Sequence, residues 1–358
     1  MRSVKILGAG SIGNHLAHGC RERGWAVTMV DRDPAALERT RESIYPSRYG
    51  AFDPGIRLSE PSAVAAEEFD LVILGTPPDT HLPLALEVLS TRPPRVLLIE
   101  KPLCPPGRRG CAELLARAEA AGTRVLVGYN HRLTRHTRIA EQWLAEGGLG
   151  EITTLRAQFR EHWGGIFAAH PWLAGPAETY LGFTERGGGA LGEHSHAINI
   201  FQHFARLAGL GRITQLSAAL DEVTADGAAY DRIAQLSVVT ESGHLGLIAQ
   251  DVVTRPAEKW LRLQGSEGFL EWQVNATPGC DRVLEQREDG FMREESVAKS
   301  RPDDFRGEIA HLEALLEDPK LDSPLDLTVG LETMAVIDAA LEASRGGHSV
   351  RVDYALAS

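Results

Sequence analysis

The chain has 358 residues, of which 43% are hydrophobic and 24% are charged. These values are close to average globular composition and argue against a disordered or fibrous protein, while the length predicts about two domains. The 37 basic and 49 acidic residues give a net charge of −12. Such a chain repels nucleic acid and anionic membranes at long range, so we expect neither as a partner.

The cysteines and the N-terminal segment indicate a compartment. Cys20, Cys104, Cys111 and Cys280 form no CxxC pair and lack matched histidines, so we expect reduced thiols that pack in the interior. The chain starts without the charged and long apolar regions of a signal peptide. No apolar run reaches the ~20 residues of a transmembrane helix. We therefore expect a cytoplasmic protein.

Strands and helices alternate over the first third of the chain. Strands are expected at residues 4–7, 26–30, 56–58, 70–74, 95–99 and 124–128. Helices are expected at residues 11–22, 81–89 and 107–121, with a further helix starting after Asp33-Pro34. Short connections between such elements imply an α/β fold with a doubly wound parallel sheet covered on both faces. Ligands bind at the carboxyl ends of its strands.

A glycine-rich segment follows the first strand. Gly8, Gly10 and Gly13 form a GxGxxG pattern, and Ser11 and Ile12 complete the loop. Gly8 allows a sharp turn after the strand, and Gly13 allows the helix to lie close to the sheet. Gly10 leaves the amides at the helix N-terminus open to a pyrophosphate. Strand, glycines and helix in this order predict a dinucleotide site.

The second strand ends on an acidic residue that bears on cofactor choice. Asp31 stands where a carboxylate accepts hydrogen bonds from the adenosine ribose. The same carboxylate repels the 2′-phosphate of NADP, so the sequence favours NAD. Arg32 keeps NADP as the alternative, because a guanidinium can pair with that phosphate.

The remaining two thirds have a different pattern. A helix is expected at 135–146, and strands at 151–160, 213–220, 233–240, 244–253, 259–264 and 269–274. Glycine-containing turns at 241–243 and 266–268 are typical of hairpins. Helices are expected at 305–316 and 327–343, and residues 281–302 are expected as an exposed excursion. We therefore expect a largely antiparallel sheet with one face on helices.

Four further segments carry a resemblance to a known family. They are Gly75-Thr76-Pro77-Pro78, Glu100-Lys101-Pro102-Leu103, Gly128-Tyr129-Asn130-His131-Arg132, and Gly187-Gly188-Gly189-Ala190-Leu191, which leads to His196. With the N-terminal glycines they resemble, in order and over most of the chain, the glucose–fructose oxidoreductase/inositol dehydrogenase/rhizopine-catabolism (Gfo/Idh/MocA) family.

The resemblance implies an NAD(P)-dependent dehydrogenase of two domains. Residues 1–128 would form a Rossmann domain, and residues 129–358 an α/β domain for substrate binding and oligomerisation. The open, mostly antiparallel sheet of the second domain implies a homodimer or homotetramer. The further cofactor-binding residues are predicted to be Thr76, Pro77, His81, Glu100, Lys101 and Asn130.

Lys101 is the predicted catalytic cation. Hydride transfer from a secondary alcohol needs a base for the hydroxyl proton and a cation for the developing alkoxide. Lys101 ends a sheet strand beside the predicted nicotinamide site, and the resemblance gives it this catalytic position. The resemblance also implies a cis peptide at Pro102. The alternative is a surface lysine in a salt bridge.

His196 is the predicted base, because a neutral imidazole suits proton transfer near pH 7. The family pattern places a carboxylate before this histidine and an Asp three residues after it. Here Glu193 replaces the usual Asp one residue closer, and Asn199 replaces the second Asp. Glu193 would orient the imidazole or bind a substrate hydroxyl. His194 is the rival base.

A metal site is another interpretation of this segment. Glu193, His194, His196 and His203 suggest a metal site, but their spacing suits a strand better than the expected helix, so no metal is predicted.

The substrate pocket is expected between the two domains. Its predicted lining residues are Lys101, Asn130, Arg132, Arg160, His162, His170, Trp172, Glu193, His196 and Asn199.

These predictions converge on an NAD-dependent dehydrogenase. Its substrate would be a ring hydroxyl or ketone of a sugar, a cyclitol or a sugar derivative. An NAD-dependent glycoside hydrolase that oxidises its substrate transiently uses the same residues and is the alternative. A cofactor-sensing regulator is a third class, which the presence of both Lys101 and His196 disfavours.

Overall fold

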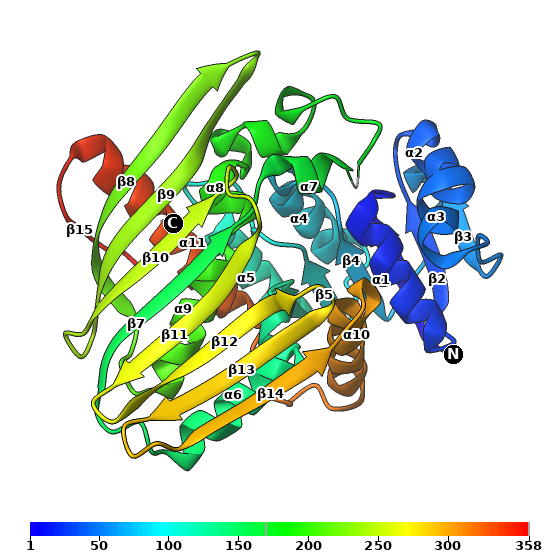
Figure 1. Ribbon diagram of the computed structural model, residues 1–358. Coiled ribbons are helices and arrows are strands. Elements are labelled where there is room, and N and C mark those ends of the chain that lie inside the picture. Colours follow the sequence, from blue (N-terminus) through cyan, green and yellow to red (C-terminus); the bar gives the residue numbers. More distant parts are fainter. Residues whose placement is uncertain (169, 357–358) are drawn as a thin grey trace.

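The N-terminal part of the chain forms the expected doubly wound sheet. The computed structural model describes residues 1–168 and 170–356. Six parallel strands lie in the order β3-β2-β1-β4-β5-β6 (Figure 1). They are β1 (Ser3–Leu7), β2 (Ala26–Val30), β3 (Ile56–Ser59), β4 (Leu71–Leu74), β5 (Val96–Ile99) and β6 (Arg124–Val127). Every residue of β4 and β5 is buried, because helices cover both faces of the sheet.

The helices of this region follow the predictions with one shift. They are α1 (Ser11–Glu22), α2 (Pro34–Arg39), a π-helical turn (Thr40–Ile44), α3 (Tyr45–Tyr49), α4 (His81–Thr91) and α5 (Cys111–Ala121). The Asp33 side chain caps α2 by accepting from the amide of Ala35. Helix α5 starts at Cys111 instead of residue 107, because Gly107, Arg108 and Gly110 adopt positive φ angles that a helix excludes.

The rest of the chain builds a second, larger sheet. Its nine strands lie in the order β14-β13-β12-β11-β7-β10-β9-β8-β15, and only β7 and β10 pair in parallel. The strands are β7 (Ile152–Arg160), β8 (Ile213–Ala225), β9 (Ala228–Thr240), β10 (Leu245–Asp251), β11 (Glu258–Gly265), β12 (Gly268–Thr277), β13 (Cys280–Arg287), β14 (Met292–Ala298) and β15 (Val350–Arg351). Helices α6 (Arg135–Glu146), α9 (His196–Leu207) and α11 (Leu327–Gly346) pack on one face (Figure 1).

The prediction of an exposed excursion at 281–302 is wrong. This stretch contains β13 and β14, the outer strands of the sheet. Their inward positions include the buried carboxylates of Asp281 and Glu285, which pair with Lys299 and with Arg287 and Arg293. Charged residues at buried positions hide the alternation on which a prediction of strands depends.

The two C-terminal helices join the two sheets. Helix α10 (Arg301–Glu317) lies along α1 of the first domain, and α11 contacts β6 as well as β8 (Figure 1). A large buried cluster of apolar side chains runs through both sheets, and Cys20, Cys104 and Cys111 are buried as free thiols within it. In the described part of the chain, no helix is long and apolar enough to cross a membrane.

Candidate active site

The glycine loop between β1 and α1 fits a dinucleotide. Gly8 has a φ of +105°, and a Cβ there would lie 2.7 Å from the Gly75 carbonyl oxygen. A Cβ at Gly13 would lie 2.1 Å from the Gly8 oxygen, so helix and loop are in direct contact. A Cβ at Gly10 would meet no atom within 4 Å. The open space over Gly10 leaves room for a pyrophosphate against the loop.

Asp31 closes the other side of this loop. Its Oδ2 accepts from the amide of Ala9 at 2.8 Å, and its Oδ1 accepts from the amide of Asp33 at 2.9 Å. Arg32 is exposed beside it. These bonds hold the carboxylate at the end of β2, next to the glycine loop, where the adenosine ribose lies in proteins of this fold.

His81 has a structural position instead of the predicted cofactor contact. Its ring is fully buried, with Nε2 2.8 Å from the Thr76 carbonyl oxygen and Nδ1 3.1 Å from that of Pro102. Burial lowers the pKa of His81. The imidazole therefore links the backbone after β4, at Thr76, to the backbone after β5, at Pro102. Pro77, beside Thr76, is exposed at the same edge.

Lys101 leaves β5 and reaches a residue of the second domain. Its Nζ donates to the Glu193 carbonyl oxygen at 2.8 Å and to the Glu193 Oε2 at 3.0 Å. The Lys101-Pro102 peptide is cis, as the resemblance implies. Two residues predicted separately as catalytic, Lys101 and Glu193, are thus brought into contact across the domain boundary, and both side chains are largely buried. The predicted contact of Glu193 with the imidazole or with a substrate hydroxyl stays a prediction.

The glycine triplet positions Glu193 and His196. Gly189 starts α8 (Gly189–Glu193) with a φ of +75°, and a Cβ there would lie 1.9 Å from Asp231 Oδ1. The buried Asp231 carboxylate accepts from the amide of Leu191 at 2.8 Å. Only glycine allows α8 to lie this close to β9. Helix α9 then begins at His196.

His196 lies in an aromatic environment beside a cation. Its ring centroid is 4.5 Å from that of His131 and 5.5 Å from that of Tyr129, both in edge-to-face geometry. Burial, together with the charges of Lys101 and Lys259, holds the pKa of His196 well below 6.5. The imidazole is therefore neutral near pH 7 and able to accept a proton.

Arg132 and Asn199 were predicted to line the substrate pocket, and the structure corrects both. Arg132 is 5% exposed and Asn199 is 1% exposed. Arg132 Nε donates to Asn199 Oδ1 at 2.6 Å, and Asn199 Nδ2 donates to Thr333 Oγ1 at 3.0 Å. The two side chains tie α9 and α11 to the segment after β6. The sequence alone does not show that the Arg132 and Asn199 side chains form a hydrogen bond with each other in the interior.

The other predicted lining residues lie on separate segments. Arg160 ends β7 and donates to the buried Asp251. His162 Nδ1 accepts from the amide of Gly164 at 2.7 Å. His170 and Trp172 meet edge to face with centroids 5.2 Å apart on the loop after α7 (Trp163–Ala168). Asn130 starts the turn after β6. Their contact with a substrate stays a prediction.

Four residues of this region were missed by the sequence analysis. Lys259 and His131 lie near His196, Arg48 bonds Ser11 in the glycine loop, and Arg301 lies near His15 of α1. His131 lies within the quoted GYNHR segment, which is the only sequence signal for any of them. For the metal alternative, no group of three or more His, Cys, Asp or Glu side chains suited to an ion occurs in the described ranges.

Glu100, which precedes Lys101, lies near a second buried carboxyl, that of Glu308. Glu308 on α10 is fully buried, and neither of its carboxyl oxygens has a partner among the described residues. Burial and the neighbouring Glu100 raise the pKa of Glu308 well above 4.5. Burial likewise raises the pKa of Glu100, to about 7, and its Oε2 accepts from the Lys101 amide at 3.3 Å. Both carboxyls thus keep their protons to higher pH than an ordinary glutamate does, and Glu100 accepts a hydrogen bond from the Lys101 backbone.

Replacing Glu308 with glutamine is expected to stabilise the protein as pH rises. When folding raises the pKa of a carboxyl, the free energy of unfolding of the protein falls as pH increases from about 4.5 through the folded-state pKa. The decrease is at most about 1.4 kcal/mol per pH unit. Glu308→Gln removes this loss, so its unfolding free energy should gain at least about 1 kcal/mol on wild type between pH 5 and pH 8. Urea unfolding at both pH values measures it. The exposed Glu317→Gln on the same helix is the control, and parallel profiles for wild type and Glu308→Gln would contradict the expectation.

The open glycine loop of a Rossmann domain and a strand-end lysine bonded to Glu193 of a second domain define a two-domain NAD-binding oxidoreductase. Two family models agree: "Oxidoreductase family, NAD-binding Rossmann fold" matches residues 2–129, and "GFO/IDH/MocA C-terminal domain" matches residues 137–271. The chain belongs to the GFO/IDH/MocA oxidoreductase family, as the motifs predicted.

Solved structures share the fold at low sequence identity. Aldose-aldose oxidoreductase from Caulobacter crescentus, complexed with glycerol, is 18% identical, with 98% of this chain and 99% of that chain covered and a TM-score of 0.76. Levoglucosan dehydrogenase, in complex with NADH and levoglucosan, is 16% identical, with 99% and 100% covered and a TM-score of 0.77. The WlbA dehydrogenase from Bordetella pertussis, in complex with NADH and UDP-GlcNAcA, is 20% identical, with 98% of each chain covered and a TM-score of 0.73. No protein of curated function matches the chain.

Proposed function

We propose that the protein transfers a hydride between NAD and a ring hydroxyl or ketone of a sugar, a cyclitol or a sugar derivative. The observation that carries this proposal is the Lys101–Glu193 pair across the domain boundary, beside a neutral His196. NAD, when bound, supplies the hydride acceptor at nicotinamide C4. The chain supplies the groups that bind, orient and deprotonate the alcohol.

Lys101 holds the reacting oxygen. An ammonium has three N–H donors, and two of those of Lys101 go to the Glu193 carbonyl and carboxylate. The third is available for the substrate oxygen. The pairing with Glu193 also fixes the lysine side chain before substrate arrives, so the positive charge is already in place when negative charge develops on that oxygen.

His196 takes the hydroxyl proton during oxidation and returns it during reduction. Its lowered pKa keeps the ring in the accepting form. The rival base, His194, is 3% exposed, and its Nε2 has no partner in the described part of the chain. Because His196 is partly exposed and His194 is buried, we assign the proton transfer to His196.

A polar substrate suits the residues around this pair. Asn130 starts the turn after β6, Arg160 ends β7, and His162 follows two residues later. Hydroxyl groups of a sugar or cyclitol match such donors and acceptors. The relatives whose structures hold levoglucosan and UDP-GlcNAcA support the same substrate class.

Asp31 is expected to decide between the two cofactors. Replacing it with asparagine removes the charge that favours ribose hydroxyls and repels a 2′-phosphate. We expect Asp31→Asn to bind NADH about tenfold more weakly than wild type does. The ratio of NADH affinity to NADPH affinity should fall as well. Fluorescence titration of both cofactors measures this. Asp33→Asn, which changes a neighbouring exposed carboxylate, is the matched control, and an unchanged NADH/NADPH ratio in Asp31→Asn would refute the assignment.

A substrate panel tests the proposed function. Cyclitols, aldoses, uronates and amino sugars are each incubated with NAD and, separately, with NADP, while absorbance of the reduced cofactor is followed. Net NADH formation with a free polyol or sugar supports the dehydrogenase. Glycosidic bond cleavage without net NADH formation supports the NAD-dependent hydrolase instead. No turnover of any kind would count against both.

A further inference from the structure

We propose that Arg48 of the first domain and Arg301 of the second bind the phosphates of the dinucleotide from opposite sides of the glycine loop. This inference rests on the proposed function, because its ligand is NAD. It assigns a phosphate-binding role to two residues outside the glycine pattern, and it makes cofactor binding bridge the two domains.

Arg48 lies directly at the start of α1. Its Nη1 donates to the Ser11 carbonyl oxygen at 2.8 Å, and its Nη2 donates to Ser11 Oγ at 2.7 Å. The π-helical turn before it is fixed to the same loop, because Thr40 Oγ1 donates to the Ala9 carbonyl oxygen at 2.9 Å. In the described ranges, no carboxylate pairs with Arg48. Its charge is therefore uncompensated next to Gly10 and the α1 N-terminus.

Helix α10 brings Arg301 to the same place. Helices α1 and α10 lie side by side and run in the same direction (Figure 1). Near their N-terminal ends the Phe305 ring stacks on that of His15, with centroids 4.7 Å apart, and near their C-terminal ends Glu313 pairs with Arg23. The N-terminus of α10 therefore lies beside that of α1. The Arg301 guanidinium sits 5.2 Å over the Phe305 ring, on the helix end nearest the loop.

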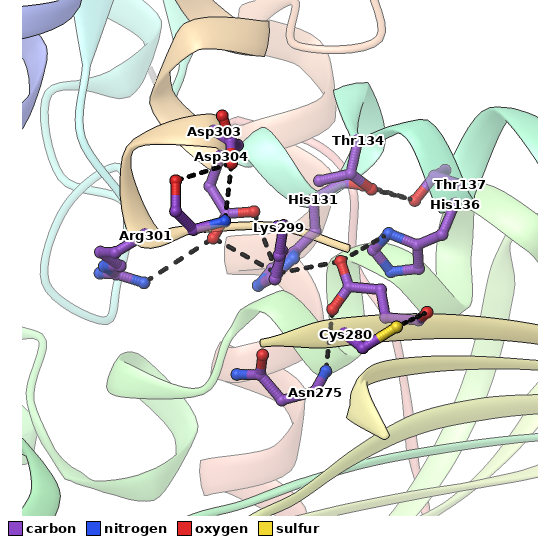
Figure 2. Close-up of polar contacts among 12 residues, drawn as sticks. His131, Thr134, His136, Thr137, Asn275, Cys280, Lys299, Arg301, Asp303 and Asp304 are labelled. Carbon is purple, nitrogen blue, oxygen red and sulfur yellow. Dashed lines mark hydrogen bonds and ion pairs between the residues drawn. The ribbon is translucent and has the colours of Figure 1, made fainter. Parts of the chain in front are cut away.

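The acidic residues near Arg301 are engaged elsewhere. Figure 2 shows Asp304 beside Lys299, whose Nζ donates to its Oδ1 at 3.1 Å, while Arg301 keeps only a 3.9 Å contact with the same carboxylate. Asp303 accepts from the Ser300 amide at 2.6 Å. The Arg301 side chain is 64% exposed and points away from the Lys299 group. It is thus available to a ligand.

Two guanidinium groups close to the N-terminal part of α1 favour an anion there. Arg48 and Arg301 each act on His15, and burial and their two charges lower the pKa of that histidine to about 3. Like charges in one place repel each other unless a negative group lies between or beside them. Two helix N-termini add to the positive potential. A pyrophosphate, with its charged oxygens, fits this arrangement.

The test measures binding of ADP-ribose, which carries the pyrophosphate, and of adenosine, which lacks it, by isothermal titration calorimetry. We expect Arg48→Gln and Arg301→Gln each to weaken ADP-ribose about tenfold, and the double variant by about a hundredfold, with adenosine affinity unchanged. Added salt should weaken ADP-ribose more in wild type than in the double variant. Arg345→Gln, which changes an exposed arginine on α11 away from the loop, is the matched control.

The outcomes separate the two proposals. ADP-ribose affinity that matches wild type in both glutamine variants overturns the phosphate assignment and leaves the proposed function intact. A wild-type protein that binds neither ADP-ribose nor NADH overturns the proposed function together with this inference. If Arg48→Gln also loses adenosine, its loop has been altered, and the exposed Arg301→Gln alone decides the question.

Discussion

Lys101→Ala is expected to lower kcat by about 10²–10³-fold while NADH binding is largely retained. The ammonium is the positive group at the domain boundary that Glu193 holds in place, through bonds of 2.8 and 3.0 Å. Removing it takes away the stabilisation of the substrate oxygen, which matters most when negative charge develops there. Steady-state kinetics with a substrate from the panel, together with NADH titration, measure both effects.

Two controls make this prediction specific. Lys320→Ala removes an exposed lysine far along the chain and should leave kcat unchanged. A thermal melt shows whether Glu193, left without its cation, destabilises the fold. A Lys101→Ala protein that is folded, binds NADH and retains wild-type kcat would show that Lys101 is only a salt-bridge residue.

His196→Asn is expected to lower kcat by about 10²–10⁴-fold, the usual contribution of a positioned general base. Asparagine keeps a polar side chain of similar size but cannot accept and release the proton. His194→Asn should retain most activity, because His194 is buried away from the partly exposed face of His196. Kinetics of the two variants side by side measure the difference, and a larger loss in His194→Asn would reverse the assignment of the base.

The pH profile of the wild type carries the same argument. Burial, Lys101 and Lys259 hold the pKa of His196 well below 6.5. Its proton-accepting form therefore persists as pH falls through 6.5, and kcat/KM for alcohol oxidation should decline only at lower pH. A loss of activity centred near 6.5 that disappears in His196→Asn would mean that the histidine titrates like an exposed one.

The parallel sheet and the glycine loop were predictable because each depends on local patterns. Apolar runs such as Leu71–Leu74 and the spacing of Gly8, Gly10 and Gly13 are read within a few residues. Lys101, Glu193 and His196 were predictable from the family motifs, and the structure brings Lys101 and Glu193 into contact.

Other parts depend on pairing between distant segments. Asp281 and Glu285 occupy buried strand positions only because Lys299 and two arginines compensate them. Arg132 and Asn199 look like pocket residues until their mutual hydrogen bond is seen. Arg301 comes near His15 of α1 because α10 packs along α1. A single sequence gives no signal for such pairs.

The most direct measurement follows the hydrogen itself. A substrate from the panel, deuterated at the carbon that bears the reacting hydroxyl, is incubated with NAD and the wild-type protein. The reduced cofactor is then isolated, and its mass is measured by mass spectrometry. We predict NADH that carries the deuterium, formed at least about a hundredfold more slowly by Lys101→Ala. Reduced cofactor without the label, or equal rates of labelling in wild type and Lys101→Ala, would contradict it.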